Sequence, residues 1–305
     1  MKKLWSMMVL FLVIISACGE NEEGETSSEE AELGDSTITY ESENGPIEVP
    51  ANPERVVVLS SFNAGSVMAL DVNIVGADSW VKNNDNFAPY VENAEEVSDE
   101  SLEKIIELDP DLIIAAPTNN NLDKLGEIAP IVTYTYGNVD YLEQHIEIGK
   151  LLNKEEEART WVDEFTQRAE EAGEEIKSKI GQDTTVSVLE SFDKQLYVFG
   201  DNWGRGTEIL YQEMELEMPQ KVEEMALEEG YLAISHEVIP EYAGDYVILS
   251  SDGADNSFKE TETYQNIPAV QNDRVFETSA AEFYFNDPIT LEYQLEFFQD
   301  KFLAE

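Results

Sequence analysis

The sequence predicts an α/β fold of two lobes that one long helix joins. Three observations support this prediction. Short β-branched runs alternate with helical patterns, one helical pattern extends over about seven turns, and one helix-turn-strand segment occurs twice. A repeated order of strand then helix is typical of a sheet whose strands are mainly parallel.

The first lobe is expected over residues 37–153. Two runs in it, Arg55–Leu59 and Asp111–Ala115, are continuous and rich in valine, leucine and isoleucine. Such runs suit strands that are buried on both faces. Helical patterns follow these runs, which gives the alternating order of an α/β lobe.

A long amphipathic helix is predicted over residues 154–181. Asn153 and Glu156 have the spacing of a capping box, which predicts where the helix starts. The face opposite the apolar stripe is dense in glutamate, so the helix should lie along the surface as a stiff connector. The apolar positions are Ala158, Trp161, Val162, Phe165, Ala169, Ala172, Ile176 and Ile180.

A second α/β series is expected over residues 182–305. Its strand-like runs begin at Thr185, Asp245 and Arg274. The segment Ser235–Ile248 aligns without gaps on Ser101–Ile114 and matches it at six of fourteen positions. Two lobes of related design would produce this pairing, and so would chance similarity between two common helix-turn-strand units.

The N-terminus has the pattern of an export signal. Two lysines precede an apolar stretch, Leu4–Ile15, that is shorter than the roughly 20 residues a membrane-spanning helix needs. We expect residues 1–17 to be a signal peptide and residues 18–36 to be a flexible acidic tether. Cys18, the single cysteine of the chain, would carry the lipid anchor; the alternative is a buried free cysteine.

The charge of the chain excludes some partners. Lys and Arg number 18 and Asp and Glu number 65, which gives a formal net charge of −47. Such a surface repels nucleic acid, so no nucleic-acid partner is expected. The acidic residues are spread along the whole chain, which indicates a surface adapted to saline or alkaline surroundings.

The sequence lacks the usual signatures of catalysis and of protein-bound metal. His145 and His236 are the only histidines, too few for the cages that hold bare transition metals. His145 lies in the apolar stripe of a helix predicted over Tyr141–Leu152, which favours a core role. Neither a G-x-S-x-G elbow nor a phosphate-binding G-x-x-x-x-G-K-[ST] loop occurs. We therefore expect no enzyme, no cofactor and no metal ligated by the protein.

One loop offers binding chemistry. Tyr197 is expected to end a strand-like run, after which a loop punctuated by glycines displays Trp203 and Arg205 before a helix that begins near Thr207. Glycines on both sides of Arg205 would let the backbone approach a ligand closely. An indole beside a guanidinium offers an apolar wall and fixed donors. The alternative is a core tryptophan and a surface arginine.

Taken together, these features resemble the iron-siderophore-binding lipoproteins of Gram-positive bacteria, particularly the ferric hydroxamate binders among the periplasmic binding proteins with a helical backbone. The resemblance covers nearly the whole chain. It rests on the lipobox at Cys18, Pro53–Val58, Leu102-Glu103 with Pro110–Ile114, the long helix, Trp203–Gly206 and Phe283–Pro288.

The resemblance implies a class III fold, in which two Rossmann-like lobes are joined by one rigid helix and the ligand lies in the cleft between them. It implies a monomer that is lipid-anchored on the extracellular face of the cytoplasmic membrane. This monomer would deliver its ligand to the permease and ATPase subunits of an ABC importer. Glu103 and Glu237, one in each lobe, match the acidic residues that dock onto permease arginines.

Charge favours a hydroxamate ligand. Ferric catecholate and citrate complexes are anionic and need clusters of basic residues, whereas this chain has five arginines. Trishydroxamate complexes are neutral or nearly so, and the siderophore itself supplies all the ligands of the iron. Alternatives are a cobalamin, haem or other ferric-chelate binder of the same fold, and a cell-surface enzyme with paired carboxylates. The expected ligand contacts are Tyr197, Trp203, Arg205 and Tyr284 in the second lobe and Trp80 and Tyr136 in the first.

Overall fold

The computed structural model of the protein describes residues 36–253 and 256–304. The signal peptide, Cys18 and all of the tether except Ser36 lie outside the described residues, so these expectations stay predictions. Among the described residues, no helix combines the length and the hydropathy that crossing a membrane requires.

The N-lobe, from β1 to α5, is built on a five-stranded parallel sheet with the order β5-β4-β3-β6-β7. Every side chain of the central strands β3 and β6 is buried, as the continuous apolar runs predict. An antiparallel hairpin, β1 with β2, precedes the sheet. The elements are β1 (Thr37–Ser42), β2 (Gly45–Pro50), β3 (Val56–Val58), α1 (Ser61–Ala69), β4 (Ile74–Ala77), α2 (Ser79–Lys82), β5 (Glu95–Glu96), α3 (Leu102–Glu107), β6 (Leu112–Ala115), α4 (Leu122–Leu125), β7 (Ile131–Thr133) and α5 (Tyr141–Leu151).

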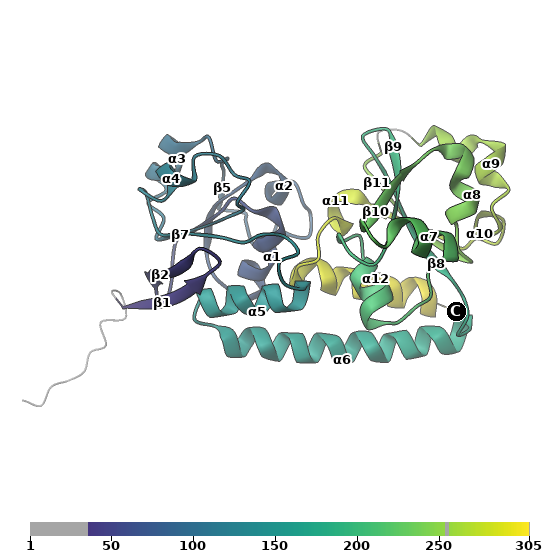
Figure 1. Ribbon diagram of the computed structural model, residues 1–305, viewed down its shortest axis with the longest axis horizontal. Helices are drawn as coiled ribbons and strands as arrows, with labels where there is room; N and C mark the ends of the chain where they lie inside the picture. The colour runs from purple at the N-terminus through teal and green to yellow at the C-terminus, as the bar shows by residue number, and fades with distance from the viewer. Residues whose placement is uncertain (1–35, 254–255, 305) are drawn as a thin grey trace, which may run out of the picture. The chain divides into compact units, whose positions relative to one another are not determined.

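The connector helix α6 (Glu155–Ile180) runs beneath both lobes in the view of Figure 1. Its first turns place Ala158 in the N-lobe core, and the later positions Phe165 and Ile176 lie in the C-lobe core. One apolar stripe therefore contributes to two cores. Since a helix carries its own hydrogen bonds, it can link the two cores as one continuous element.

The predicted capping box of α6 is wrong. Lys154 occupies the N-cap and no side chain caps the helix there. Asn153 has φ 55° and belongs to the tight turn between α5 and α6, in which the Lys154 amide donates to the Gly149 carbonyl at 2.7 Å. The turn needs a left-handed residue at position 153, and asparagine tolerates that conformation.

The C-lobe, from β8 to α12, has a mixed sheet with the order β10-β9-β8-β11-β12. β8, β11 and β12 are parallel, whereas β9 and β10 run antiparallel to their neighbours. The turn between β8 and β9 explains the reversal, because Asp193 and Lys194 have φ 45° and 64° and close a two-residue hairpin. The elements are β8 (Val186–Phe192), β9 (Gln195–Phe199), η1 (Glu208–Glu213), α7 (Gln220–Ala226), β10 (Tyr231–Ile234), η2 (His236–Val238), α8 (Ile239–Tyr242), β11 (Tyr246–Ser251), η3 (Ser257–Glu260), α9 (Glu262–Gln265), α10 (Pro268–Gln271), β12 (Val275–Ser279), α11 (Ala280–Phe283) and α12 (Pro288–Leu303).

The two similar sequence segments occupy equivalent places in the two sheets. Each ends in the fourth strand of its sheet, β6 in the N-lobe and β11 in the C-lobe. The aspartates that match in the alignment also make matching contacts. Asp111 accepts from the amides of Glu54 and Arg55 before β3, and Asp245 accepts from the amide of Thr185 before β8. These contacts favour a related design of the two lobes over chance similarity.

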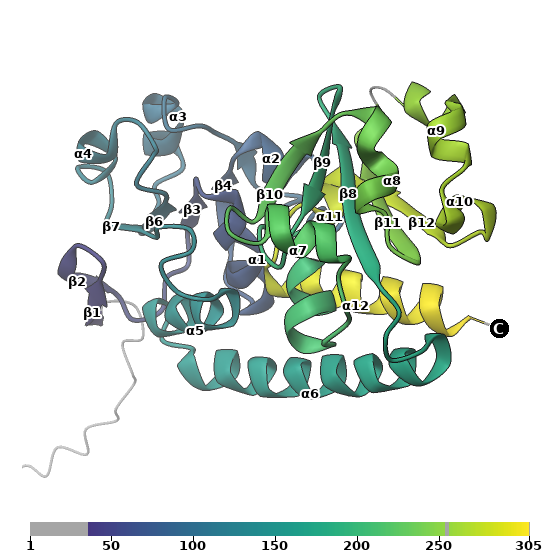
Figure 2. The same cartoon turned by 45° about the vertical axis from the view of Figure 1, so that its right-hand side comes forward.

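The C-terminal segment returns to the N-lobe. The ring of Phe285, between α11 and α12, is buried within the N-lobe core. The side-chain amides of Asn84 and Asn86 donate to the carbonyls of Ala281 and Glu282, each at 3.0 Å. In Figure 2, α12 runs between α6 and the C-lobe sheet. The lobes are thus tied by this segment as well as by α6.

Candidate functional site

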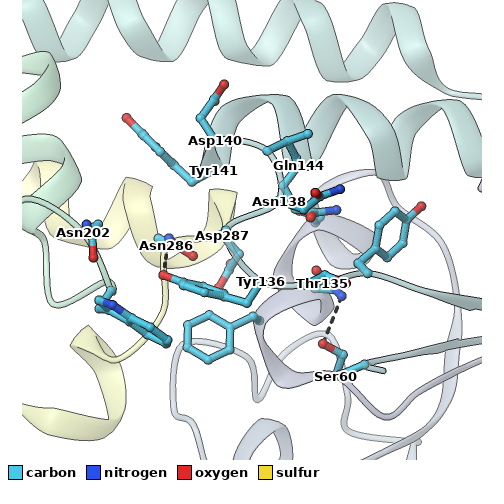
Figure 3. A pocket seen from close by; sticks show the side chains of 18 of the residues that line it. Ser60, Thr135, Tyr136, Asn138, Asp140, Tyr141, Gln144, Asn202, Asn286 and Asp287 are labelled. Carbon is cyan, nitrogen blue, oxygen red and sulfur yellow. Dashed lines mark hydrogen bonds between the residues drawn. The ribbon is translucent and has the colours of Figure 1, made fainter. Parts of the chain in front are cut away.

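A cavity of about 810 Å³ lies between the lobes. Its N-lobe wall consists of the loops that follow β3, β6 and β7, together with α1 and the start of α5. Because parallel strands end at one edge of their sheet, these three loops converge there. The C-lobe wall consists of the loop before η1, part of η1 itself and the residues before α12. Figure 3 shows side chains of this cavity.

Two of the predicted site residues meet across the cavity. The rings of Tyr136, from the N-lobe, and Trp203, from the C-lobe, are stacked with centroids 4.6 Å apart and planes at 22°. Phe62 lies 4.6 Å from Tyr136 on the N-lobe side. The Tyr136 hydroxyl accepts from the Asn286 side-chain amide at 3.2 Å, as Figure 3 shows. The described residues thus give the cavity an aromatic wall drawn from both lobes.

Arg205 is buried and does not line the cavity. Its guanidinium forms an ion pair with Glu190 of β8, with Nη2 and Oε1 3.0 Å apart, and both side chains are nearly inaccessible. Its Nη1 donates to the Trp203 carbonyl at 2.7 Å, and its Cζ lies 3.6 Å from the centroid of the Tyr284 ring. A buried guanidinium needs a counter-charge, and Glu190 supplies it here. Arg205 therefore holds the backbone of Trp203 on the side away from the cavity.

The glycines on both sides of Arg205 allow other parts of the chain to pack closely against this loop. Gly204 has φ 74°, and a β-carbon there would lie 2.3 Å from the Tyr284 carbonyl oxygen. At Gly206 the β-carbon would lie 2.5 Å from the Phe298 ring. The expected close approach to a ligand is thus replaced by close packing against the segment before α12 and against α12.

The remaining predicted residues are not part of the cavity wall. Trp80 and Tyr284 form one aromatic group, and Tyr197 belongs to another, which reaches Trp203 through Tyr231. Trp80, in α2 and 46% exposed, lies 4.9 Å from Tyr284 and 6.0 Å from Phe192 by ring centroids. Tyr197 lies 6.1 Å from Tyr231. Tyr197 is in the middle of β9, so the expectation that it ends a strand is wrong. Arg205 touches both groups, since it contacts the Trp203 carbonyl and the Tyr284 ring.

Glu208, at the start of η1, is a buried carboxylate of the cavity wall. It accepts from the Gly204 amide at 2.9 Å, from the Asn286 side-chain amide at 2.8 Å and from the Thr207 hydroxyl at 3.0 Å. Burial raises the pKa of Glu208. Asp287 of the same wall caps α12, and burial raises its pKa to about 6. Polar groups thus reach the cavity next to its aromatic rings.

Sequence reasoning missed several residues of this wall. Phe62, Asn138, Gln144 and Glu208 line the cavity and were not singled out. Phe62 lies at the start of α1, just after β3, and the carboxyl ends of parallel strands are where a binding cleft is expected, so its position was a usable signal. A carboxylate inside an apolar strand, as at Glu190, is a further signal, because such a charge is buried only with a partner.

The permease-docking candidates are exposed. Glu103 lies in the first turn of α3 and Glu237 in η2, at matching positions of the two similar segments. The Ser235 hydroxyl lowers the pKa of Glu237. Within residues 36–253 and 256–304, no group of three or more His, Cys, Asp or Glu side chains is placed to hold a metal ion.

Comparison with known proteins places the chain. Residues 56–282 match the family described as periplasmic binding protein. The chain belongs to this family. This periplasmic binding protein is 36% identical to the iron(3+)-hydroxamate-binding protein FhuD of Bacillus subtilis, over 97% of its own length and 96% of the relative. It is 33% identical to YxeB of the same organism, also named an iron(3+)-hydroxamate-binding protein, over 97% of this chain and 95% of the relative.

Solved structures of periplasmic binding proteins share the fold. The FhuD protein from S. pseudintermedius superposes with a TM-score of 0.80 at 34% identity, covering 89% of this chain and 99% of that one. FhuD2 from Staphylococcus aureus with bound ferrioxamine B gives a TM-score of 0.78 at 32% identity, covering 82% of this chain and 98% of that one. The predicted fold class and the family resemblance are confirmed.

Proposed function

We propose that the protein is the substrate-binding component of an ABC importer and that it captures a ferric hydroxamate siderophore between its lobes. One observation carries the proposal. The cavity of about 810 Å³ has an aromatic wall to which both lobes contribute, through Tyr136 and Trp203. Apolar walls with a few polar groups suit a bulky chelate whose iron is already fully coordinated.

The charge of the cavity supports a hydroxamate over other iron chelates. Among the described residues, neither Lys nor Arg lines the cavity. The nearby Arg205 is paired with Glu190. A catecholate or citrate complex would place several negative charges beside Glu208 without a compensating cation, which is costly in a partly desolvated site.

Delivery to the membrane would use both lobes. Glu103 and Glu237 are exposed carboxylates at equivalent positions of the two lobes, which suits contact with a permease that presents two similar basic surfaces. Charge reversal of either residue should reduce transport and leave ligand affinity in solution unchanged. A transport assay with each variant, beside a binding titration, separates the two effects.

Cys18 would anchor the protein to the extracellular face of the membrane. The lipobox-like Ile15-Ser16-Ala17-Cys18 and the relative named as a probable siderophore-binding lipoprotein support this location. Cys18→Ala should prevent acylation and move the protein out of the membrane fraction. Retention of that variant in the membrane would contradict the anchor.

The ligand class is tested by tryptophan fluorescence. Purified protein is titrated with ferrioxamine B, ferrichrome, ferric citrate, cobalamin and haem. We expect saturable quenching by the two hydroxamate complexes, because Trp203 lies in the cavity wall and iron complexes quench indoles. Quenching by cobalamin, haem or citrate complex with no response to either hydroxamate would reject the proposed ligand.

A further inference from the structure

The wall of the cavity is acidic. Asp140, Glu208 and Asp287 line it, and in the described part of the chain no basic side chain does. Glu213 is a further carboxylate behind this wall, where it accepts from the hydroxyl of the lining residue Tyr141 at 2.5 Å. The protein surface around the site reinforces this sign, since the formal net charge of the chain is −47.

Glu208 has no cationic partner among the described residues. Its three hydrogen-bond donors, from Gly204, Thr207 and Asn286, are all neutral groups. Burial raises the pKa of this carboxyl, and the hydrogen bonds that both of its oxygens accept favour the ionised form. Arg205, the nearby guanidinium, makes its ion pair with Glu190 instead. A cationic group on a ligand would supply the counter-charge that Glu208 lacks among the described residues.

The aromatic rings of the cavity add to the same preference. Phe62, Tyr136 and Trp203 lie side by side along the wall, with Trp203 stacked on Tyr136 and the Phe62 ring tilted by 60° to Tyr136. The face of an aromatic ring attracts a cation, most strongly when the ring is an indole. Aromatic faces next to carboxylates are a combination that recognises an alkylammonium group.

We infer that the cavity selects ferric hydroxamates that carry a positive charge, in the form of a pendant ammonium group, over neutral complexes with the same chelating groups. This inference rests on the proposed function. The hydroxamate part occupies the aromatic wall, and the ammonium group lies in the negative field of Glu208 and Asp140. Iron stays coordinated by the siderophore throughout.

Two ligands that differ only in this charge provide the test. Ferrioxamine B carries a free primary ammonium, and its N-acetyl derivative has the same iron site with a neutral amide in place of the ammonium. At low ionic strength we expect ferrioxamine B to bind about tenfold more tightly, a difference typical of partly screened charges at such a surface. In 1 M NaCl the ratio of the two affinities should fall towards one.

Variants assign the preference to the cavity. Glu208→Gln keeps a side-chain oxygen as an acceptor, and Asp140→Asn keeps a residue that caps α5, so each removes charge with little change in structure. We expect each to reduce the ratio of the two affinities about threefold. Asp300→Asn, an exposed carboxylate of α12, is the matched control and should leave the ratio unchanged.

The outcomes separate this inference from the proposed function. Equal binding of both ligands, or tighter binding of the acetylated one, overturns the charge preference and leaves hydroxamate binding intact. A preference that Asp300→Asn reduces as much as Glu208→Gln does would assign it to the whole surface and overturn the role of the cavity. Binding of neither ligand rejects the proposed function itself.

Discussion

The two walls of the cavity are built differently. On the N-lobe side, Tyr136 and Asn138 stand on an exposed loop after β7, and the exposed Glu43 holds this loop through hydrogen bonds. On the C-lobe side, Trp203 is backed by the buried ion pair of Arg205 and Glu190. A wall on a surface loop can adjust to the shape of a ligand, whereas a wall fixed by buried charges keeps one position. We expect the C-lobe to set the ligand's place.

The largest effect should come from breaking the buried ion pair. Glu190→Ala leaves the Arg205 guanidinium buried without its counter-charge, which typically costs 3–5 kcal/mol of unfolding free energy. Urea unfolding followed by tryptophan fluorescence measures the loss. Replacing both residues with apolar ones, Glu190→Leu with Arg205→Met, should recover much of the stability. A loss below about 1 kcal/mol for Glu190→Ala would show that the pair does not fix this wall.

His145 extends the comparison between the lobes. Unlike the paired Arg205 and Glu190 of the C-lobe, it is a buried polar side chain of the N-lobe that lacks a hydrogen-bond partner among the described residues. Neither ring nitrogen has a hydrogen-bond partner among the described residues, and the ring packs edge-on against Trp161 of α6 at 5.1 Å. Burial lowers the pKa of His145 from 6.5 to about 4. The folded protein therefore keeps this imidazole neutral.

The pH dependence follows from that pKa. Between pH 6.5 and 4 the unfolded chain takes up a proton at His145 that the folded protein does not, so acidification destabilises the fold, by about 3 kcal/mol at pH 4. His145→Leu should remove this part of the pH dependence, and unfolding curves at pH 7.5 and 4.5 measure it. Identical pH slopes for the variant and the wild-type protein would contradict a neutral buried His145.

Ligand affinity should depend more on the C-lobe wall than on the N-lobe wall. Trp203→Ala removes a ring whose backbone carbonyl is held by Arg205, and we expect a loss of roughly 2–3 kcal/mol in the binding of ferrioxamine B. Tyr136→Ala removes its stacking partner on the exposed loop and should cost about 1 kcal/mol. Calorimetric titration of both variants measures the difference. A larger loss for Tyr136→Ala would reverse the assignment of fixed and adjustable walls.

The smallest effect is expected at Glu43. Its carboxylate accepts from the amide and hydroxyl of Thr135 and from the Asn138 side chain, but in an exposed position. Glu43→Ala should lower the unfolding free energy by less than about 1 kcal/mol, since exposed polar contacts compete with water. The same urea measurement that tests Glu190→Ala tests this variant, and equal losses for the two would remove the contrast between the walls.

The order of strands and helices could be predicted from the sequence. β3, β6 and α6 follow directly from apolar runs and from a stripe with helical spacing, because burial selects those residue types locally. The direction of β9 could also have been read from Asp193 and Lys194, had the two-residue turn been recognised. The cap of α6 was misassigned because Asn153 serves the preceding turn.

The site was harder to predict. The role of Trp203 in the cavity wall agrees with its place in a loop between a strand and a helix. The burial of Arg205 depends on Glu190, which lies 15 residues earlier on a strand, and no local pattern specifies that pairing. Glu208 likewise gains its surroundings from Asn286, which lies 78 residues away in the sequence. Such contacts are properties of the packed chain.

The place of Phe285 has a consequence for the order in which the protein can fold. The N-lobe core contains the ring of Phe285, which is synthesised after the entire C-lobe sheet. The side-chain amides of Asn84 and Asn86 can form their hydrogen bonds only with carbonyls that are synthesised almost 200 residues later. A growing chain therefore cannot complete its first lobe early. The first lobe of such a protein reaches its final packing only after the last helix has been made.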